Sequence, residues 1–429
     1  MHERHFLPAL PFLLLAAAHY RRLWLAYVWF SFSYLANLIF GYQQAPGNPV
    51  LLPFINNLSK LFSGLNLVAF GALILNLLPD KKQSLPRPII KANSSPLHWG
   101  LIIILVLSFL VRVVRLGTPP EYQFDEVYHA FTSREMLKNN PQAWEWWNQA
   151  PADNVAYEWT HPPLSKHFMV LGLLLFGDNS FGWRFPAVIF GVANIFLVFL
   201  IARQLFGGTI PLLAAGLYSL ENLSFVQSRV GMNDTYMVFF VLLSIYALLT
   251  RKITASALSF ALALSTKWSA IYALPVLFVV HSLTHKSLFI IHKSIRLAAL
   301  FIGIPIIVYL ATYAPFFISG HSWDQFIELQ QQMYWYHTRL DATHDYASAW
   351  WSRPLMLRPV WYYVHYTENS IANTYALGNP IIFWASLLAV IWSLLKLVTN
   401  RYWLLSIPLA GYLSFLLPCC SKPHGLKKI

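Results

Sequence analysis

Two neighbouring carboxylates, Asp125 and Glu126 in the stretch QFDEVYHA, are the residues of this sequence whose chemistry most needs an explanation. They precede a helix-compatible stretch, so one interpretation is a helix N-cap with negative charge at the positive end of the helix dipole. A capping box would need Glu or Gln at position 128, where Tyr128 stands. The other interpretation is a reactive site, because a carboxylate can take a proton from a hydroxyl nucleophile or bind a cation. The local pattern leaves both open.

Basic residues that could bind an anion follow the acidic pair. In THPPLSK two prolines fix the backbone, so a rigid turn is the alternative to an anion site made by His161 and Lys166. Arg184 opens an apolar segment, where it either reaches lipid headgroups or clamps a phosphate. Lys267 interrupts nearly continuous apolar sequence, and ionisable groups at such positions generally mark a function or a paired site.

Two further groups of charged residues have a structural alternative as well. Asp234 is expected to cap the next helix with Arg229 as its ion-pair partner. A late polar region is rich in aromatic and basic residues that either rest on lipid headgroups or recognise a phosphate. Its basic members are His337, Arg339, His344, Arg353 and Arg358.

Several common chemistries lack their motifs here. The sequence has no Gly-rich phosphate loop, no GxSxG elbow and no HExxH helix, so nucleotide hydrolysis, serine hydrolysis and zinc-protease chemistry have no support. Cys419 and Cys420 are adjacent, which gives neither a disulfide framework nor a metal-ligand spacing. Lipid-phosphate chemistry and transport are the classes that remain.

The elements that must position these residues are membrane helices. Of the 429 residues 57% are hydrophobic and 11% are charged, and the mean hydropathy is +0.50, which predicts an all-α polytopic membrane protein. The predicted spans are 6–20, 23–41, 64–79, 98–116, 184–206, 210–226, 235–250, 254–266, 269–281, 297–318, 379–398 and 402–418. A helix over 167–178 is too short to span and is expected to lie at the interface.

The distribution of positive charge predicts the orientation. The net charge is +13, and the basic residues fall in alternate short loops, which the positive-inside rule assigns to the cytoplasm. The longer loops 117–183 and 319–378 are then extracytoplasmic. The bilayer therefore accounts for the basic character, and no nucleic-acid partner is expected.

Taken in order, these elements resemble the protein O-mannosyltransferases and their bacterial relatives, a branch of the GT-C class of lipid-phosphate-dependent glycosyltransferases. The family's Asp-Glu pair, His-Pro-Pro-Leu-x-Lys element and following arginine are matched by Asp125 and Glu126, by His161, Pro162, Pro163, Leu164 and Lys166, and by Arg184. Its Ser-Arg-x4-Asp and Ser-x-Lys-Trp elements are matched by Ser228, Arg229 and Asp234 and by Ser265, Lys267 and Trp268. The late signature of actinobacterial-type members is matched by His344, Tyr346, Ser348, Trp351, Arg358 and Pro359.

The resemblance implies a GT-C transmembrane helix bundle whose long first extracytoplasmic loop bears interfacial helices. It implies an inverting transfer of a sugar, mannose above all, from a polyprenyl or dolichyl phosphate to Ser or Thr hydroxyls of a secreted or membrane protein. The reaction would take place on the extracytoplasmic face of a bacterial or archaeal plasma membrane. The lipid-linked sugar is the only co-substrate implied, and a divalent metal is an alternative that the resemblance does not favour. The oligomeric state is left open.

The resemblance also implies roles for single residues. Asp125 is expected to be the base, with Glu126 orienting the acceptor or the base. The donor phosphate is expected to be bound by Arg184, Arg358 and His344, with Lys166 and Lys267. Supporting roles go to His161, Arg229 and Asp234, and no residue is assigned as a metal ligand.

Two alternatives to protein mannosylation stay open. An aminoarabinose transferase-like enzyme would pass its sugar to a lipid or glycan with the same donor chemistry. A transporter without enzymatic activity would carry solute even with Asp125 replaced by Asn.

The resemblance is incomplete at both ends and in detail. Asp345 and Arg353 replace the proline and tryptophan usual in the late signature, and the loop 319–378 is too short for the MIR domain of eukaryotic members, which predicts a prokaryotic form. We expect residues 1–84 to be a group of spans resembling the tail of another GT-C protein, and 85–97 a cytoplasmic linker. The transferase domain, 98–418, is expected to be C-terminally truncated, with 419–429 as a tail.

Overall fold

The computed structural model describes residues 96–149, 151–284, 291–339, 352–366, 371–400 and 403–416. The predicted spans 6–20, 23–41 and 64–79 lie outside the described residues, as does nearly all of the predicted linker 85–97. The division of the chain into these domains therefore stays a prediction.

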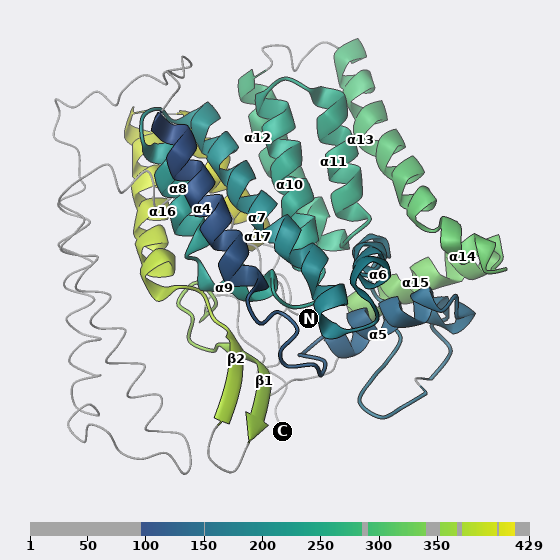
Figure 1. Ribbon diagram of the computed structural model, residues 1–429. Helices are drawn as coiled ribbons and strands as arrows, with labels where there is room; N and C mark the ends of the chain where they lie inside the picture. The colour runs from purple at the N-terminus through teal and green to yellow at the C-terminus, as the bar shows by residue number, and fades with distance from the viewer. Residues whose placement is uncertain are drawn as a thin grey trace, which may run out of the picture.

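Most of the described chain is a bundle of helices standing side by side (Figure 1). Its members are α4 (Pro96–Val113), α7 (Ser180–Leu205), α8 (Ile210–Ser219), α10 (Asp234–Leu249), α11 (Ile253–Leu264), α12 (Leu274–Thr284), α13 (Ile291–Thr312), α16 (Pro380–Asn400) and α17 (Ser406–Leu416). Each coincides with a predicted span, because long apolar runs form helices whose backbone groups bond internally. The mainly helical fold is confirmed.

Some predicted spans are broken in the structure. The span 210–226 is two helices, because α8 ends at Ser219 and Glu221 then caps the N-terminus of α9 (Asn222–Gln227), where its carboxylate accepts hydrogen bonds from the amides of Leu223 and Ser224. The 3-10 helix η2 (Trp268–Ala273) precedes α12, and α14 (Ala314–Ile318) follows α13. Two described helices, Ser180–Leu205 and Pro380–Leu397, are long and apolar enough to cross a membrane, and eight shorter apolar helices accompany them.

The core of the bundle lies around α7 and α10. α10 packs against α7, α11 and α12, and α7 also packs against α4, α6 and α8. Their facing side chains form one large buried apolar cluster, which includes Ile195, Val198, Met237 and Val241. The N-terminal ends of α7 and α10 are therefore held at fixed positions, and both carry charged residues of the sequence motifs.

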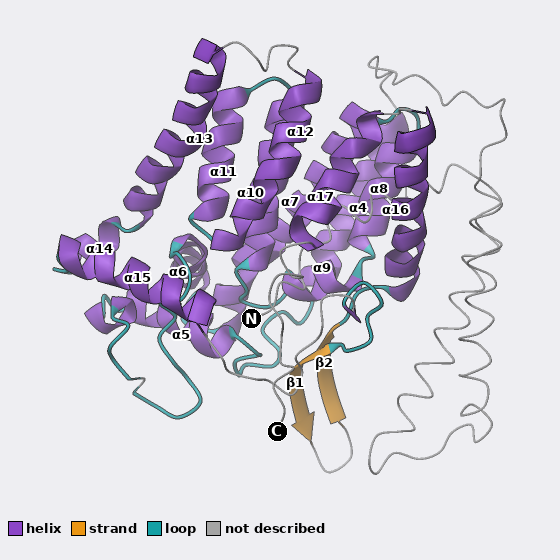
Figure 2. Ribbon diagram, turned by 180° about the vertical axis from the view of Figure 1, so that it is seen from behind, coloured by secondary structure: helices purple, strands orange, loops and turns teal. Residues whose placement is uncertain are grey.

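Short elements gather at one end of the bundle, below it in Figure 1 and again in the reverse view of Figure 2. They are α5 (Glu126–Leu137), η1 (Pro141–Trp144), α6 (Leu164–Phe176), α14 and α15 (Trp323–Arg339). The helix predicted over 167–178 is confirmed as α6, which packs against α5 and α7. The described parts of the two predicted long loops therefore contain helices, and these helices cover this end of the bundle.

A β-hairpin departs from the predicted all-α fold. Strands β1 (Val360–Tyr366) and β2 (Ile371–Ala376) pair antiparallel, with Val360 opposite Ala376 and an irregularity between Trp361 and Tyr363. β-branched and aromatic residues favour strands, and the rings of Trp361 and Tyr375 stack across the pair with centroids 5.8 Å apart. Strands of 7 and 6 residues are too short to stand out as apolar spans in the sequence.

Candidate active site

The acidic pair lies where the loop after α4 enters α5. Phe124 has a φ of 48°, a left-handed conformation that is uncommon for a residue with a side chain. Its ring stacks on that of Tyr362 in β1, with centroids 4.2 Å apart, and the Tyr362 hydroxyl accepts a hydrogen bond from Gln227 Nε2 at 2.5 Å. The hairpin and α9 thus fix the backbone just before Asp125.

Asp125 occupies the N-cap position of α5 without acting as a cap. Its side chain accepts no hydrogen bond from the first amides of the helix, although its carbonyl accepts from the amides of Tyr128 and His129. The capping interpretation of this carboxylate is therefore wrong, because its oxygens make no hydrogen bond to the first amides of the helix.

Glu126 is fully buried and forms a two-point ion pair with Arg184 at the start of α7. Arg184 Nε lies 2.8 Å from Glu126 Oε1, and Arg184 Nη2 lies 2.6 Å from Oε2. Both side chains have no exposed surface. The Glu126 carboxylate also accepts from the amides of Gln123 and Gly231, at 2.9 and 2.8 Å. Both carboxylate oxygens of Glu126 are thus engaged by groups of the protein, so Glu126 supports the loop and does not contact the acceptor.

Arg184 has no N–H left for a phosphate. Besides its two bonds to Glu126, it donates from Nη1 to the carbonyls of Leu116 and Pro119 and from Nη2 to the carbonyl of Glu121. A guanidinium has five N–H groups, and all of them are engaged by protein. The expected role of Arg184 as a phosphate clamp does not fit this geometry, because binding a phosphate would break the bonds that hold the acidic loop.

Asp125 faces a different set of charges from its neighbour. Burial, and next the nearby carboxylate of Glu158, raises the pKa of Asp125 to about 7, while the ammonium of Lys267 opposes the increase. A carboxyl group with this pKa is half deprotonated at neutral pH and keeps enough basicity to take a proton from a hydroxyl. This is the property that the predicted base requires.

Lys267 and Asp234 are brought together beside Asp125. Lys267 Nζ lies 2.8 Å from Asp234 Oδ1, with 13% and 3% of the two side chains exposed. The predicted ion pair of Asp234 with Arg229 is therefore wrong. Arg229 instead donates to the carbonyls of Val111 and Val114 at the C-terminal end of α4, at 2.8 and 3.0 Å, because this guanidinium satisfies carbonyls that have no partner within the helix.

The side chain of Lys166 bonds to the backbone carbonyls of His161 and Glu158. Lys166 Nζ donates to the carbonyls of Glu158 and His161 at 2.8 and 3.0 Å, and only 1% of its residue surface is exposed. The turn made by the two prolines therefore serves to lock the lysine into the loop. Both interpretations of THPPLSK hold in part: the turn is rigid, and it buries a positive charge beside the acidic site.

Glu158 and His129 were not singled out from the sequence. The imidazoles of His129, His161 and His337 form a stack, with centroids 6.0 Å and 5.1 Å apart. Burial lowers the pKa of His129 to about 4, so its contact with Glu158 at 3.7 Å joins a neutral ring to a carboxylate. Glu158 also accepts from the hydroxyl of Thr160 at 2.5 Å. An acidic residue three positions before the His-Pro-Pro element was the available signal.

Two further predicted phosphate ligands come from the late polar region. Arg358 is exposed in the turn before β1, and His344 lies outside the described residues. The structure thus brings Asp125, Asp234, Lys166, Lys267 and His161 into one region, and it places Arg184 and Glu126 beneath that region as its support. Among the described residues, no three His, Cys, Asp or Glu side chains form a group able to hold a metal ion.

Two family models match the chain in succession. Residues 160–311 match "Dolichyl-phosphate-mannose-protein mannosyltransferase", and residues 322–407 match "C-terminal four TMM region of protein-O-mannosyltransferase". The chain belongs to the protein O-mannosyltransferase family. The matched regions contain His161, Arg184, Arg229, Asp234 and Lys267, and the acidic pair precedes them.

Individual members of the family extend the match over most of the chain. The polyprenol-phosphate-mannose–protein mannosyltransferase of Mycolicibacterium smegmatis is 27% identical over 403 residues, which cover 75% of this chain and 76% of that protein. The protein of the same name from Mycobacterium tuberculosis is 25% identical and covers 78% of each chain. An undecaprenyl phosphate-alpha-4-amino-4-deoxy-L-arabinose arabinosyl transferase from Pseudomonas fluorescens is 26% identical over 59% of this chain and 46% of its own length.

Proposed function

We propose that this protein transfers mannose from a polyprenyl or dolichyl phosphate to Ser or Thr hydroxyls of a protein, with inversion at the anomeric carbon. The observation that carries the proposal is Asp125: a partly buried carboxylate beside a lysine, with its pKa raised to about 7 and its oxygens not used for capping. The names of the mycobacterial relatives support the choice of donor and acceptor.

The reaction is a single displacement. The acceptor oxygen attacks the anomeric carbon from the face opposite the phosphate, the bond from that carbon to the phosphate oxygen breaks, and the hydroxyl proton passes to Asp125. A phosphate is a good leaving group and needs no strong acid, whereas an alcohol is a weak nucleophile and needs a positioned base. Direct displacement inverts the stereochemistry at the carbon.

The departing phosphate is proposed to be bound by Lys267. Its ammonium has three N–H groups and already acts on Asp125 electrostatically. Lys166 is more deeply buried and contributes positive charge while it bonds to backbone carbonyls. Arg358 and His344 stay predicted ligands of the same phosphate. Glu126 and Arg184 are proposed to act indirectly, by holding the loop so that Asp125 faces Lys267.

The membrane setting follows from the same family. We propose a GT-C helix bundle in a bacterial or archaeal plasma membrane, with α5, α6, α15 and the hairpin at the extracytoplasmic interface. Two described helices meet the length and hydropathy of a span, and the gathered short elements in Figures 1 and 2 would lie at one membrane surface.

The test is a transfer assay with membranes containing the full chain. A labelled polyprenyl-phosphate-mannose is supplied together with a Ser/Thr-rich acceptor peptide, and label is measured separately in the peptide and lipid fractions. Label in the peptide that disappears with Asp125→Asn supports the proposal. Label that leaves the donor and appears in a different lipid or a glycan favours the aminoarabinosyl-type alternative, which the Pseudomonas relative makes the second candidate. Solute flux that survives Asp125→Asn, with no transfer, favours the transporter.

A further inference from the structure

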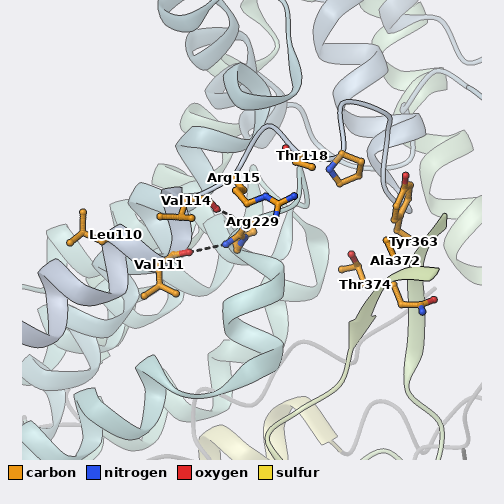
Figure 3. Close-up of a pocket in the computed structure, with 11 residues that line it drawn as sticks. Leu110, Val111, Val114, Arg115, Thr118, Arg229, Tyr363, Ala372 and Thr374 are labelled. Carbon is orange, nitrogen blue, oxygen red and sulfur yellow. Dashed lines mark hydrogen bonds between the residues drawn. The ribbon is translucent and has the colours of Figure 1, made fainter. Parts of the chain in front are cut away.

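A pocket of about 610 Å³ lies apart from the Asp125 site, between the C-terminal end of α4 and the β-hairpin (Figure 3). Two arginines, Arg115 and Arg229, are among its lining residues, and no carboxylate is. None of the residues proposed above for catalysis lines it. The pocket is therefore a basic site that the transfer reaction leaves without a function.

One wall of the pocket is an exposed apolar helix face. Leu110, Val111 and Val114 line the pocket and are 51%, 54% and 59% exposed. The same face continues along α4 through Val106 and Leu107, which are exposed to a similar degree. In the membrane placement proposed above, such a face contacts hydrocarbon chains, since lipid tails are as apolar as these side chains.

One of the two arginines of the pocket is fixed in place. Arg229 is anchored through Nη1 and Nη2 to two carbonyls of α4, which uses two of its five N–H groups. Arg115 has a φ of 54° two residues after the end of α4, is exposed, and makes no side-chain hydrogen bond or ion pair within the described residues. Figure 3 shows the two guanidinium groups beside one another. Both positive charges line the same pocket, so the pocket favours an anion that can accept hydrogen bonds from guanidinium groups.

The hairpin supplies a polar wall opposite the arginines. Tyr363 and Thr374 reach the pocket from β1 and β2 in Figure 3, and Asn373 of β2 also lines it. The amide oxygen of Asn373 accepts from Trp361 Nε1 at 2.9 Å, which leaves its amino group as a donor. The Tyr363 hydroxyl donates to the carboxylate of Glu121, which does not line the pocket, at 3.4 Å. The pocket thus joins an apolar strip, two cations and hydrogen-bonding groups in that order.

We propose that this pocket binds the phosphate of an anionic membrane phospholipid between Arg115 and Arg229, with the acyl chains along the exposed face of α4. Guanidinium groups bind phosphate oxygens through paired hydrogen bonds. The hairpin groups are suited to the glycerol of the headgroup. A phospholipid fits better than the sugar donor because the pocket's lining excludes Asp125, Asp234 and Lys267, so a sugar bound here would not meet the base. The inference rests on the membrane placement and not on the transfer reaction.

The experiment is native mass spectrometry of the full chain released from detergent. The protein is titrated in separate arms with phosphatidylglycerol, phosphatidylcholine and a polyprenyl phosphate. The variant is Arg115→Gln, which removes the charge without breaking a described contact. The matched control is Arg251→Gln, because Arg251 is also exposed, also has a positive φ, and also stands two residues after a helix end.

The expected result is a phosphatidylglycerol complex that weakens about tenfold in Arg115→Gln and is unchanged in Arg251→Gln, the loss expected for one charge-assisted bond. The proposal is overturned if phosphatidylcholine binds as tightly as phosphatidylglycerol. It is also overturned if the affinity for phosphatidylglycerol falls equally in both variants, or does not fall in Arg115→Gln. A preference for polyprenyl phosphate that depends on Arg115 also overturns it, in favour of a donor site. Lipid binding is measured without turnover, so the result can be interpreted even if the protein does not carry out the proposed transfer reaction.

Discussion

Glu126 and Arg184 form a fully buried ion pair in which both carboxylate oxygens face the guanidinium, at 2.8 and 2.6 Å. The pair joins the first turn of α5 to the first turns of α7, which belongs to the packed centre of the bundle. Asp125 is thereby attached to the rigid part of the molecule through its neighbour. In this sequence motif the first acid is the candidate reagent, and the second acid holds it in position.

Removal of one partner of this pair is expected to destabilise the protein strongly. Arg184→Gln leaves a buried carboxylate without its counter-charge, and breaking such pairs costs about 3–5 kcal/mol. The apparent melting temperature in detergent should fall clearly. Lys138→Gln is the control, because Lys138 pairs with Glu135 at the surface with 57% of its side chain exposed, where a pair is worth about 0–1 kcal/mol. Equal effects of the two variants would contradict the buried role.

Asp125→Asn is expected to abolish most of the transfer while the protein still folds. A general base contributes about 10²- to 10⁴-fold to a rate, and the amide cannot take up the proton. Initial rates with saturating donor and acceptor measure the loss. Asp153→Asn, which changes an exposed aspartate of the same loop, should leave the rate unchanged. A rate within about threefold of the wild type for Asp125→Asn would refute the base assignment.

The pH profile should report the ionisation of Asp125. The base works only when deprotonated, so with its pKa raised to about 7 the rate should fall as the pH drops below 7. Glu158→Gln removes a negative charge that disfavours the ionised form of Asp125, which lowers its pKa and moves the rising limb to more acidic pH. Measurement of kcat/KM between pH 5 and 9 tests this. A shift toward alkaline pH would show that Glu158 acts by another route.

Lys267→Gln should shift the same profile in the opposite direction. The ammonium opposes the increase in the pKa of Asp125, so its loss raises that pKa further and moves the rising limb to more alkaline pH. The KM for the donor should also increase, by about tenfold for one lost charge-assisted bond to phosphate. Lys138→Gln again serves as the control for the loss of a positive charge. An altered KM with an unshifted profile would separate phosphate binding from the effect on Asp125.

Close packing of α6 on α7 is expected to be sensitive to one added carbon. A Cβ at Gly172 would collide with the carbonyl oxygen of Gly182 and with the ring of Pro186, so Gly172→Ala should cost about 1–3 kcal/mol and displace the helix that carries Lys166. Gly303 also lies within a helix but has open space around it, so Gly303→Ala should not lower the melting temperature. Comparison of the two melting curves in detergent tests the contact.

Much of this protein could be inferred from the sequence, because the relevant signals are local. Apolar runs predicted the helices of the bundle, since a helix in lipid must satisfy its own backbone. Charged residues within or beside those runs stood out as candidates, and Asp125, Lys166, Lys267 and Asp234 do lie in one region. The order of short motifs was enough to point to the family that the comparisons support.

Only the tertiary structure decided which groups each charged side chain pairs with. The sequence paired Asp234 with Arg229 because they are close along the chain, whereas the fold brings Lys267 from beyond α11 to Asp234. The family resemblance assigned Arg184 to the donor phosphate, whereas five protein acceptors surround it in the structure. Charge type and spacing are properties of the chain, but the satisfaction of a buried charge depends on groups that meet only when the chain has folded.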